Sequence, residues 1–101
     1  MAKRPRTDRR IAERDARKLV RDREKLAALS AGGAREHPIS VTSAAVIEVR
    51  VRSMQCPQCL GEYRIGDHAA PASGLRELSV RCQLCGTPRT LWFRIVSDEP
   101  N

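Results

Sequence analysis

The sequence predicts a small α+β protein: an N-terminal basic helix, a flexible linker and an antiparallel β unit that carries two cysteine turns. Three observations lead to this fold class. Residues 8–30 contain no Gly or Pro and consist mostly of good helix formers. Residues 45–96 contain runs of alternating apolar and polar side chains and all four cysteines. A chain of 101 residues has room for one small domain and an appendage.

The helix is predicted as a basic arm comprising residues 1–30. Thr7 or Asp8 can cap its N-terminus, and Gly32-Gly33 provides a stop at its end. The arm holds 11 Lys and Arg against 5 Asp and Glu, whereas the rest of the chain holds 8 against 7. The formal net charge of +7 therefore belongs almost entirely to the arm, which suggests two parts with different roles.

Winding the arm at about 100° per residue separates a basic face from an apolar one. The basic face contains no acid and comprises Arg10, Arg14, Arg17, Lys18, Arg21 and Lys25. The roughly opposite side comprises Ala12, Ala16, Leu19, Val20, Leu26 and Ala27. This apolar stripe is too thin to predict a coiled coil, although self-association through it stays open.

Two interpretations of the arm compete. The first is a solvated helix laced by salt bridges such as Glu13–Arg17 and Asp22–Lys25. The second is a basic face that follows a phosphate backbone or another acidic surface. A membrane-surface helix is less favoured, because the arm has no Trp or Phe to anchor it.

Residues 31–44 are predicted as a linker, because they contain Gly32, Gly33 and Pro38. His37 lies in this segment and is expected to be exposed to solvent rather than to bind a ligand. Residues 97–101 are predicted as a polar tail.

The β unit, residues 45–96, is predicted to contain four strands. In residues 47–52 the apolar Ile47, Val49 and Val51 alternate with charged residues, as in a half-buried strand. His68 falls in a predicted loop between the second and third strands and is expected to be solvated. The remaining strands are expected at 62–65, 75–82 and 90–96, and the loop at 66–74.

The four cysteines form two identical C-x2-C pairs separated by 22 residues. Two such pairs can surround one tetrahedral cation with four sulfurs. A core with three aromatic residues is weak, and small domains of this kind usually need a metal or disulfides. In a reducing compartment a metal is favoured over disulfides. The sequence therefore predicts one structural Zn²⁺ ion, bound by Cys56, Cys59, Cys82 and Cys85.

The order strand–CxxC–strand–loop–strand–CxxC–strand resembles the zinc-ribbon fold over residues 45–96. The motifs that carry the resemblance are Cys56-Pro57-Gln58-Cys59 and Cys82-Gln83-Leu84-Cys85-Gly86. In zinc ribbons each CxxC turn is a knuckle whose backbone N–H groups point at the sulfurs. A glycine directly after the second cysteine supplies the left-handed residue that this turn needs. Gly86 fits that place, whereas the first knuckle has Leu60 there, followed by Gly61.

Zinc ribbons occur in transcription factors, ribosomal proteins, enzyme subdomains and uncharacterised bacterial proteins, so the resemblance implies a metal and a fold rather than one function. Two other uses of the cysteines stay open. Rubredoxins resemble this spacing and hold iron for electron transfer, usually in an aromatic-rich core. The second of these uses is a pair of thioredoxin-like redox motifs. Against it, neither CxxC opens an evident helix that would lower a thiol pKa.

The sequence gives no sign of an enzyme or of a small-molecule substrate. Four protein ligands leave no open coordination position for metal catalysis. No Ser/His/Asp elbow, Walker loop or dinucleotide glycine pattern is present.

A binding surface could form on the predicted β unit. Arg50 and Arg52 share a face of the first predicted strand, and Trp92 and Arg94 share a face of the last. If these strands pair with the two faces aligned, the surface could stack a base or clamp a phosphate. In the alternative interpretation, arginine stems cover Trp92 and finish a thin sheet.

No stretch approaches the roughly 20 apolar residues of a membrane span, and no signal-peptide-like run follows the basic N-terminus. The chain is therefore expected in the cytoplasm, without a membrane partner. We expect a non-enzymatic zinc-binding module that binds nucleic acid, a nucleic-acid-associated protein or an acidic protein surface through the arm. The alternative is a protein-interaction or assembly adaptor with a purely structural zinc.

Overall fold

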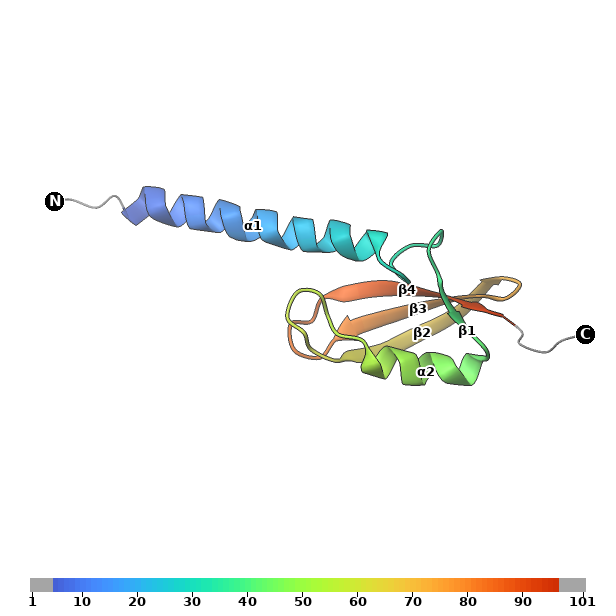
Figure 1. Ribbon diagram of the computed structural model, residues 1–101. Helices are drawn as coiled ribbons and strands as arrows, with labels where there is room; N and C mark the ends of the chain where they lie inside the picture. The colour runs from blue at the N-terminus through green and yellow to red at the C-terminus, as the bar shows by residue number, and fades with distance from the viewer. Residues whose placement is uncertain (1–4, 97–101) are drawn as a thin grey trace, which may run out of the picture.

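A long N-terminal helix, α1 (Pro5–Leu29), stands beside a small curved sheet in the computed structural model, which describes residues 5–96 (Figure 1). The predicted N-terminal helix is thus confirmed, but it begins at Pro5, so the predicted caps Thr7 and Asp8 lie within it. A second helix, α2 (Ala44–Ser53), lies on the other side of the sheet in this view. The strands are β1 (Ile39–Val41), β2 (Tyr63–Ala72), β3 (Leu75–Cys82) and β4 (Pro88–Ile95).

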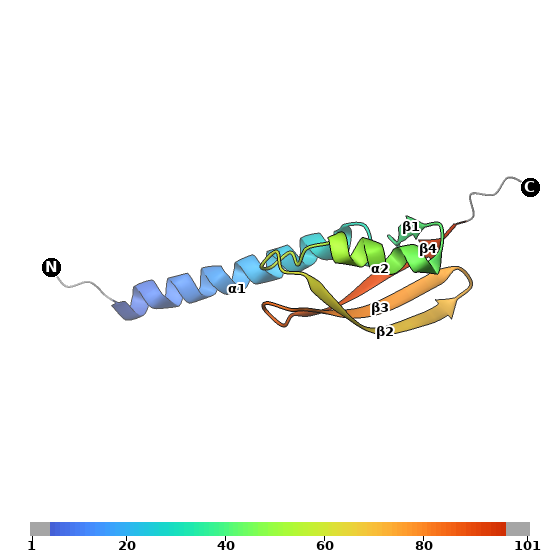
Figure 2. The ribbon, with the colours of Figure 1, turned by 90° about the horizontal axis from the view of Figure 1, so that it is seen from below.

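The sheet is mixed and has the order β1-β4-β3-β2. β2, β3 and β4 pair antiparallel, as predicted, but β1 adds to the edge of β4 in parallel. The first half of α1 extends past the cysteine end of the sheet, where the two CxxC loops lie (Figure 2). None of the described helices is long and apolar enough to cross a lipid bilayer.

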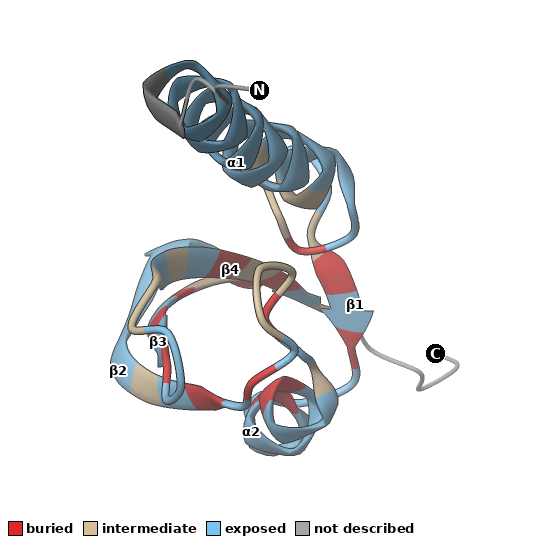
Figure 3. Ribbon diagram, turned by 90° about the vertical axis from the view of Figure 1, so that its left-hand side faces the viewer, coloured by how far each residue is buried: buried red, intermediate tan, exposed pale blue. Residues whose placement is uncertain are grey.

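The core lies between the concave face of the sheet and α2, where the buried residues gather (Figure 3). Alternate residues of β3 and β4 point into it, while Ser79, Arg81, Thr90 and Arg94 stay exposed on the convex face. The most deeply buried side chains are Phe93, Ile47, Leu78, Val51 and Cys56. A cysteine of the first pair is therefore part of the hydrophobic core.

The predicted first strand at 47–52 is wrong, because these residues belong to α2. Ile47 and Val51 are fully buried, whereas Val49 between them is 67% exposed. Residues four apart share one face of a helix, so this pair satisfies a helical pattern as well as an alternating one. Burial of that one face outweighs the weaker helix propensity of the β-branched residues.

The predicted loop at 66–74 is also wrong, because β2 continues to Ala72 and leaves a tight turn at Ser73-Gly74. Its pairing with β3 shifts register twice, between Ile65 and His68 and between Ala69 and Ala72. Gly and Pro signalled a loop, but bulges and edge strands accommodate both residue types. His68 thus lies in an exposed part of β2.

The segment predicted as a flexible linker is anchored to the sheet. Gly32 is buried, its N–H donates to the His37 carbonyl over 2.6 Å, and its carbonyl accepts from the Trp92 N–H over 2.9 Å. Ile39 and Val41 of β1 are buried in the core. Burial of these two side chains orders a stretch whose composition is typical of loops. His37 is exposed, as expected.

The predicted Arg–Trp surface does not form as expected, because Arg50 and Arg52 lie on α2 and β4 pairs with β1 and β3 instead. The guanidinium of Arg35 lies over the Trp92 ring, 5.9 Å from its centroid. Residues 97–101, predicted as a polar tail, lie outside the described residues.

Candidate metal centre

Each cysteine pair sits in a turn closed by the same two backbone hydrogen bonds. In the first knuckle, the Cys56 N–H donates to the Gly61 carbonyl (2.9 Å) and the Leu60 N–H to the Cys56 carbonyl (2.7 Å). In the second, the Cys82 N–H donates to the Thr87 carbonyl and the Gly86 N–H to the Cys82 carbonyl, both over 3.0 Å. The two knuckles are therefore structural equivalents.

The left-handed position that the resemblance assigned to Gly86 is present in both knuckles. Gly86 has φ = 75°, and Leu60 at the equivalent place has φ = 67°. A left-handed conformation disfavours any residue with a Cβ by roughly 1–2 kcal/mol. The first knuckle therefore keeps the geometry of the second despite its leucine.

Gly61 brings the two knuckles into contact. A Cβ at this position would lie 2.8 Å from Cys82 Sγ and 3.0 Å from Leu84 Cγ. Only a residue without a side chain lets the first turn approach the second pair this closely. Gly61 is thus needed because there is no room for a side chain, and not because of its backbone conformation.

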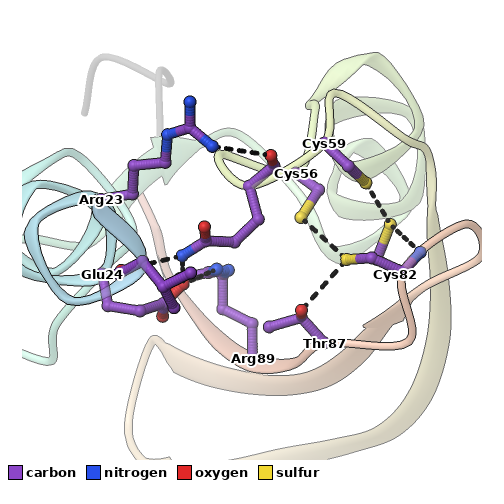
Figure 4. A network of polar contacts seen from close by, with 10 residues as sticks. Arg23, Glu24, Cys56, Cys59, Cys82, Thr87 and Arg89 are labelled. Carbon is purple, nitrogen blue, oxygen red and sulfur yellow. Dashed lines mark hydrogen bonds and ion pairs between the residues drawn. The ribbon is translucent and has the colours of Figure 1, made fainter. Parts of the chain in front are cut away.

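The knuckles gather the four predicted ligand sulfurs. Cys56 Sγ lies 3.8 Å from Cys85 Sγ, and Cys59 Sγ lies 3.3 Å from Cys82 Sγ (Figure 4). All four sulfurs lie within 4.8 Å of one another, and none is in a disulfide. A tetrahedral zinc site with four cysteine ligands and bonds of about 2.3 Å needs sulfurs roughly 3.8 Å apart. The cluster could therefore bind one metal ion, consistent with a zinc-ribbon-like site.

Hydrogen bonds already favour thiolates at the second pair. The Thr87 hydroxyl, 3.0 Å from Cys85 Sγ, is the main cause that lowers the pKa of Cys85 to about 6. The N–H groups of Cys85 and Leu84 point at Cys82 Sγ from 3.5 and 3.4 Å and lower the pKa of Cys82. Thiolates are the form that binds a metal, and stabilising them before binding reduces the number of protons to be released.

Cys59 of the first pair behaves differently, because its thiol faces the sulfur of Cys82 over 3.3 Å. That contact is the main cause that raises the pKa of Cys59 to about 12. This contact is a hydrogen bond that keeps Cys59 protonated, and a cation between the sulfurs would favour its thiolate instead. No histidine joins them: in the part of the chain that the structure describes, the group of possible metal ligands consists of the cysteines alone.

The first knuckle is also where α1 attaches. The Gln58 side-chain amide donates to the Val20 carbonyl (3.0 Å) and to Glu24 Oε2 (2.6 Å). Arg23 donates in turn to the Gln58 carbonyl over 3.1 Å. Figure 4 shows this network beside the cysteines. Gln58, one of the two residues between Cys56 and Cys59, thereby connects the cysteine cluster to the arm.

An ion pair from β4 completes this attachment. Arg89 donates to both carboxylate oxygens of Glu24, over 2.9 and 2.7 Å. The Arg89 side chain is only 10% exposed, so this pair is better shielded from solvent than an ordinary surface salt bridge. The hydrogen bonds from Arg89 lower the pKa of Glu24; burial opposes this shift, and the bond from Gln58 adds to it.

The structure leaves the predicted basic face of the arm exposed. Arg10, Arg14, Arg17, Lys18, Arg21 and Lys25 all lie in the exposed part of α1. The expected salt bridges Glu13–Arg17 and Asp22–Lys25 are not formed; among the described residues the ion pairs are Arg9–Glu13 and Glu24–Arg89. The residues that sequence reasoning missed are Gln58, Glu24 and Arg89. The one sequence feature that could have pointed to this contact is Gln58, a long polar side chain between the first two cysteines.

No protein-family model, curated protein or solved structure matches the chain, so its function has to be inferred from this site and from its surfaces.

Proposed function

We propose that this chain is a non-enzymatic zinc-binding module of the cytoplasm whose basic arm binds nucleic acid or a nucleic-acid-associated protein. The single observation that supports this choice of partner is the basic face of α1. Its six Lys and Arg side chains are all exposed, and the helix is anchored through other residues, Val20, Arg23 and Glu24. An uninterrupted row of cations on a projecting helix complements a row of phosphates.

Zinc is proposed because the donor set and its spacing fit a closed four-thiolate site. Four cysteine ligands leave no position for a substrate or a water molecule, so the metal would hold the two knuckles together. Iron in a rubredoxin-like site is the alternative. Iron–thiolate centres absorb visible light and zinc does not, so the absorption spectrum of the purified protein distinguishes the two metals.

The arm is tested by replacing Arg14, Arg17 and Arg21, which are central on the basic face, with Gln. This keeps the helix propensity and removes three charges. Binding to duplex DNA or structured RNA should weaken, and the slope of log K against log salt should flatten by about two to three units. Changing the exposed Arg50, Arg52 and Arg94 to Gln removes the same charge elsewhere and is the matched control.

The two variants separate a directed contact from a general charge effect. Equal binding by the wild type and the arm variant would reject nucleic acid as the partner of the arm. An equal loss in both variants would show attraction by net charge without a role for the basic face.

An adaptor function is the second candidate, and the exposed apolar side of α1 favours it. Leu19 is 48% exposed and Leu26 is 68% exposed, although both are large and apolar. A partner docked on this side would depend little on salt. Loss of partner binding in a Leu19→Ala/Leu26→Ala variant, with no effect of the arginine changes, would favour the adaptor.

A further inference from the structure

Two arginines face each other across the convex side of the sheet. The register of β2 and β3 places Arg64 directly opposite Arg81, and both side chains are exposed. Figure 3 shows this side of the two strands turned away from both helices. Like charges directly opposite each other in an antiparallel pair are destabilising. The ion pairs within residues 5–96 are Arg9–Glu13 and Glu24–Arg89, so neither Arg64 nor Arg81 is in an ion pair.

The two arginines flank a hollow of about 560 Å³ on this face. Ser79 and Thr90, which are direct neighbours across β3 and β4, also line it and supply two hydroxyl groups. We call this hollow the arginine trough. One carboxylate, Asp67, lines it as well. Two guanidinium groups and two hydroxyls are hydrogen-bond donors suited to a phosphate.

The bulge in β2 keeps the trough open. Gly66 lies within the register shift between Ile65 and His68 and lines the hollow. A Cβ at Gly66 would approach the Ser79 carbonyl oxygen to 3.2 Å, so a larger residue would crowd β3. The same glycine that led us to predict a loop therefore belongs to a surface depression.

Arg81 is partly oriented before any ligand binds. Its Nη1 donates to the Gly86 carbonyl oxygen over 2.7 Å, which ties the guanidinium to the second knuckle. A second hollow, of about 450 Å³, continues from Arg64 and Arg81 along Gln83 and Gly86. The positive surface is thus elongated and can accommodate a chain rather than a single small anion.

We propose that the arginine trough binds a phosphodiester group of a single-stranded nucleic acid, a second contact separate from the arm. The nature of this ligand rests on the proposed nucleic-acid function. An anionic ligand turns the unfavourable arginine pair into two charge-assisted contacts. Trp92 lies further along the same face of β4, two residues beyond Thr90, but the Arg35 guanidinium lies over its ring, so the proposed contact is with the phosphate alone.

The test compares Arg64→Gln/Arg81→Gln with Arg50→Gln/Arg52→Gln in the full, metal-loaded chain. The probe is a short fluorescein-labelled oligothymidylate, and the readout is anisotropy over a range of salt concentrations. Both arginines are proposed to contact one phosphodiester, so losing this single neutralised phosphate should flatten the salt slope by about 0.7 and weaken binding about fivefold at 0.1 M salt. The control variant on α2 should change binding much less.

A thermal melt shows whether weaker binding by Arg64→Gln/Arg81→Gln comes from a lost contact or from a less stable protein. Removing the arginine repulsion should leave the unfolding midpoint of Arg64→Gln/Arg81→Gln unchanged or raise it by about 1–3 °C. Weaker binding by a variant that is at least as stable supports the trough. Unchanged binding, or an equal loss in the control variant, overturns it.

The outcomes separate this proposal from the proposed function of the arm. If the Arg14/Arg17/Arg21 variant loses binding and the trough variant keeps it, the arm function stands and the trough is overturned. If the wild type binds no oligonucleotide, inorganic phosphate is titrated while the arginine side-chain NMR signals are followed. If the signals of Arg64 and Arg81 shift and saturate with phosphate, the trough binds anions but not nucleic acid. If these signals do not shift, the trough is not an anion site and the proposal is overturned.

Discussion

The two knuckles have the same backbone hydrogen bonds but differ in every residue except the cysteines. The first has a leucine in the left-handed position and buries Cys56 completely. The second has Gly86 there; its Cys82, the equivalent of Cys56, is also buried, whereas Cys85 is exposed. The first knuckle also contacts α1, whereas the second lies beside the arginine trough.

This difference shows that the knuckle geometry does not depend on ideal turn residues in both copies. Packing supports the first turn, through the burial of Cys56 and the contact between Gly61 and Cys82. Local chemistry supports the second, through Gly86 and the Thr87 hydroxyl. A common metal ion would join the two turns and make each depend on the other.

Loss of the metal should have the largest effect and should abolish both knuckles together. Structural zinc in finger peptides contributes on the order of 10–16 kcal/mol, more than a core of this size can replace. Chelation or Cys82→Ser should therefore unfold the sheet, while α1 keeps most of its helicity because few contacts hold it to the sheet. Circular dichroism checks the folding, and native mass spectrometry should find one zinc per chain.

The exposed ligand provides the control for this experiment. Cys85 contributes little to packing, so Cys85→Ser should unfold the sheet only if the metal holds it. A metal-free chain that keeps its strand signal and its stability would contradict the zinc proposal. Stability in Cys85→Ser together with unfolding in Cys56→Ser would indicate packing as the main force.

The glycines of the two knuckles should respond differently to alanine. Gly61→Ala places a Cβ within 2.8 Å of Cys82 Sγ and should destabilise the protein by about 2–3 kcal/mol through overpacking. Gly86→Ala meets no atom within 4 Å and should lose only the left-handed preference, about 1 kcal/mol. Chemical denaturation of the metal-loaded variants measures both values. Equal losses would show that backbone strain governs the two positions alike.

The cysteine cluster could be predicted because its signal is local: two residues between each pair of cysteines allow both sulfurs to face one point. The same holds for β3, β4 and the helix of the arm, where composition and periodicity agree. The second helix could not be assigned, because the pair Ile47 and Val51 fits both a strand and a helix until the packing partner is known.

The attachment of the arm could not be predicted for a different reason. Glu24 and Arg89 are 65 residues apart, and nothing near either one marks it as a partner of the other. β1 was missed likewise, because three residues next to Pro38 become a strand only when β4 is available for pairing. Long-range pairing decides such elements, and a single sequence carries no direct signal for it.

The attachment at the first knuckle should weaken on acidification. Because the folded-state pKa of Glu24 lies below its ordinary value of 4.5, ionised Glu24 stabilises the folded form at pH values above 4.5. This stabilisation is lost as the pH falls through the lowered folded-state pKa. The protection factors of the α1 amides near Glu24, corrected for the intrinsic exchange rate at each pH, should therefore fall in acid, while β3 stays protected as long as a metal remains bound.

Glu24→Gln tests the same contact at neutral pH. It leaves the shielded Arg89 guanidinium without its counter-ion and should destabilise the protein by about 1–2 kcal/mol. The control is Glu13→Gln, whose partner Arg9 lies 3.8 Å away on the exposed part of α1 and should contribute less than about 0.5 kcal/mol. Identical melting curves for the two variants would show that the Glu24–Arg89 pair does not hold the arm.

The smallest expected effect is a gain in stability at Leu60. Its side chain is 67% exposed, so Leu60→Gly removes little buried surface and relieves the strain of φ = 67°. Relief of about 1–2 kcal/mol is partly offset by about 0.5–1 kcal/mol of added freedom in the unfolded chain, which leaves a net gain of about 0.5 kcal/mol. The exposed Leu84, at another position in the second knuckle, is the control, and Leu84→Gly should bring no gain. A loss of stability on Leu60→Gly would mean that the leucine side chain, and not the metal and the packing of Gly61, supports the first knuckle.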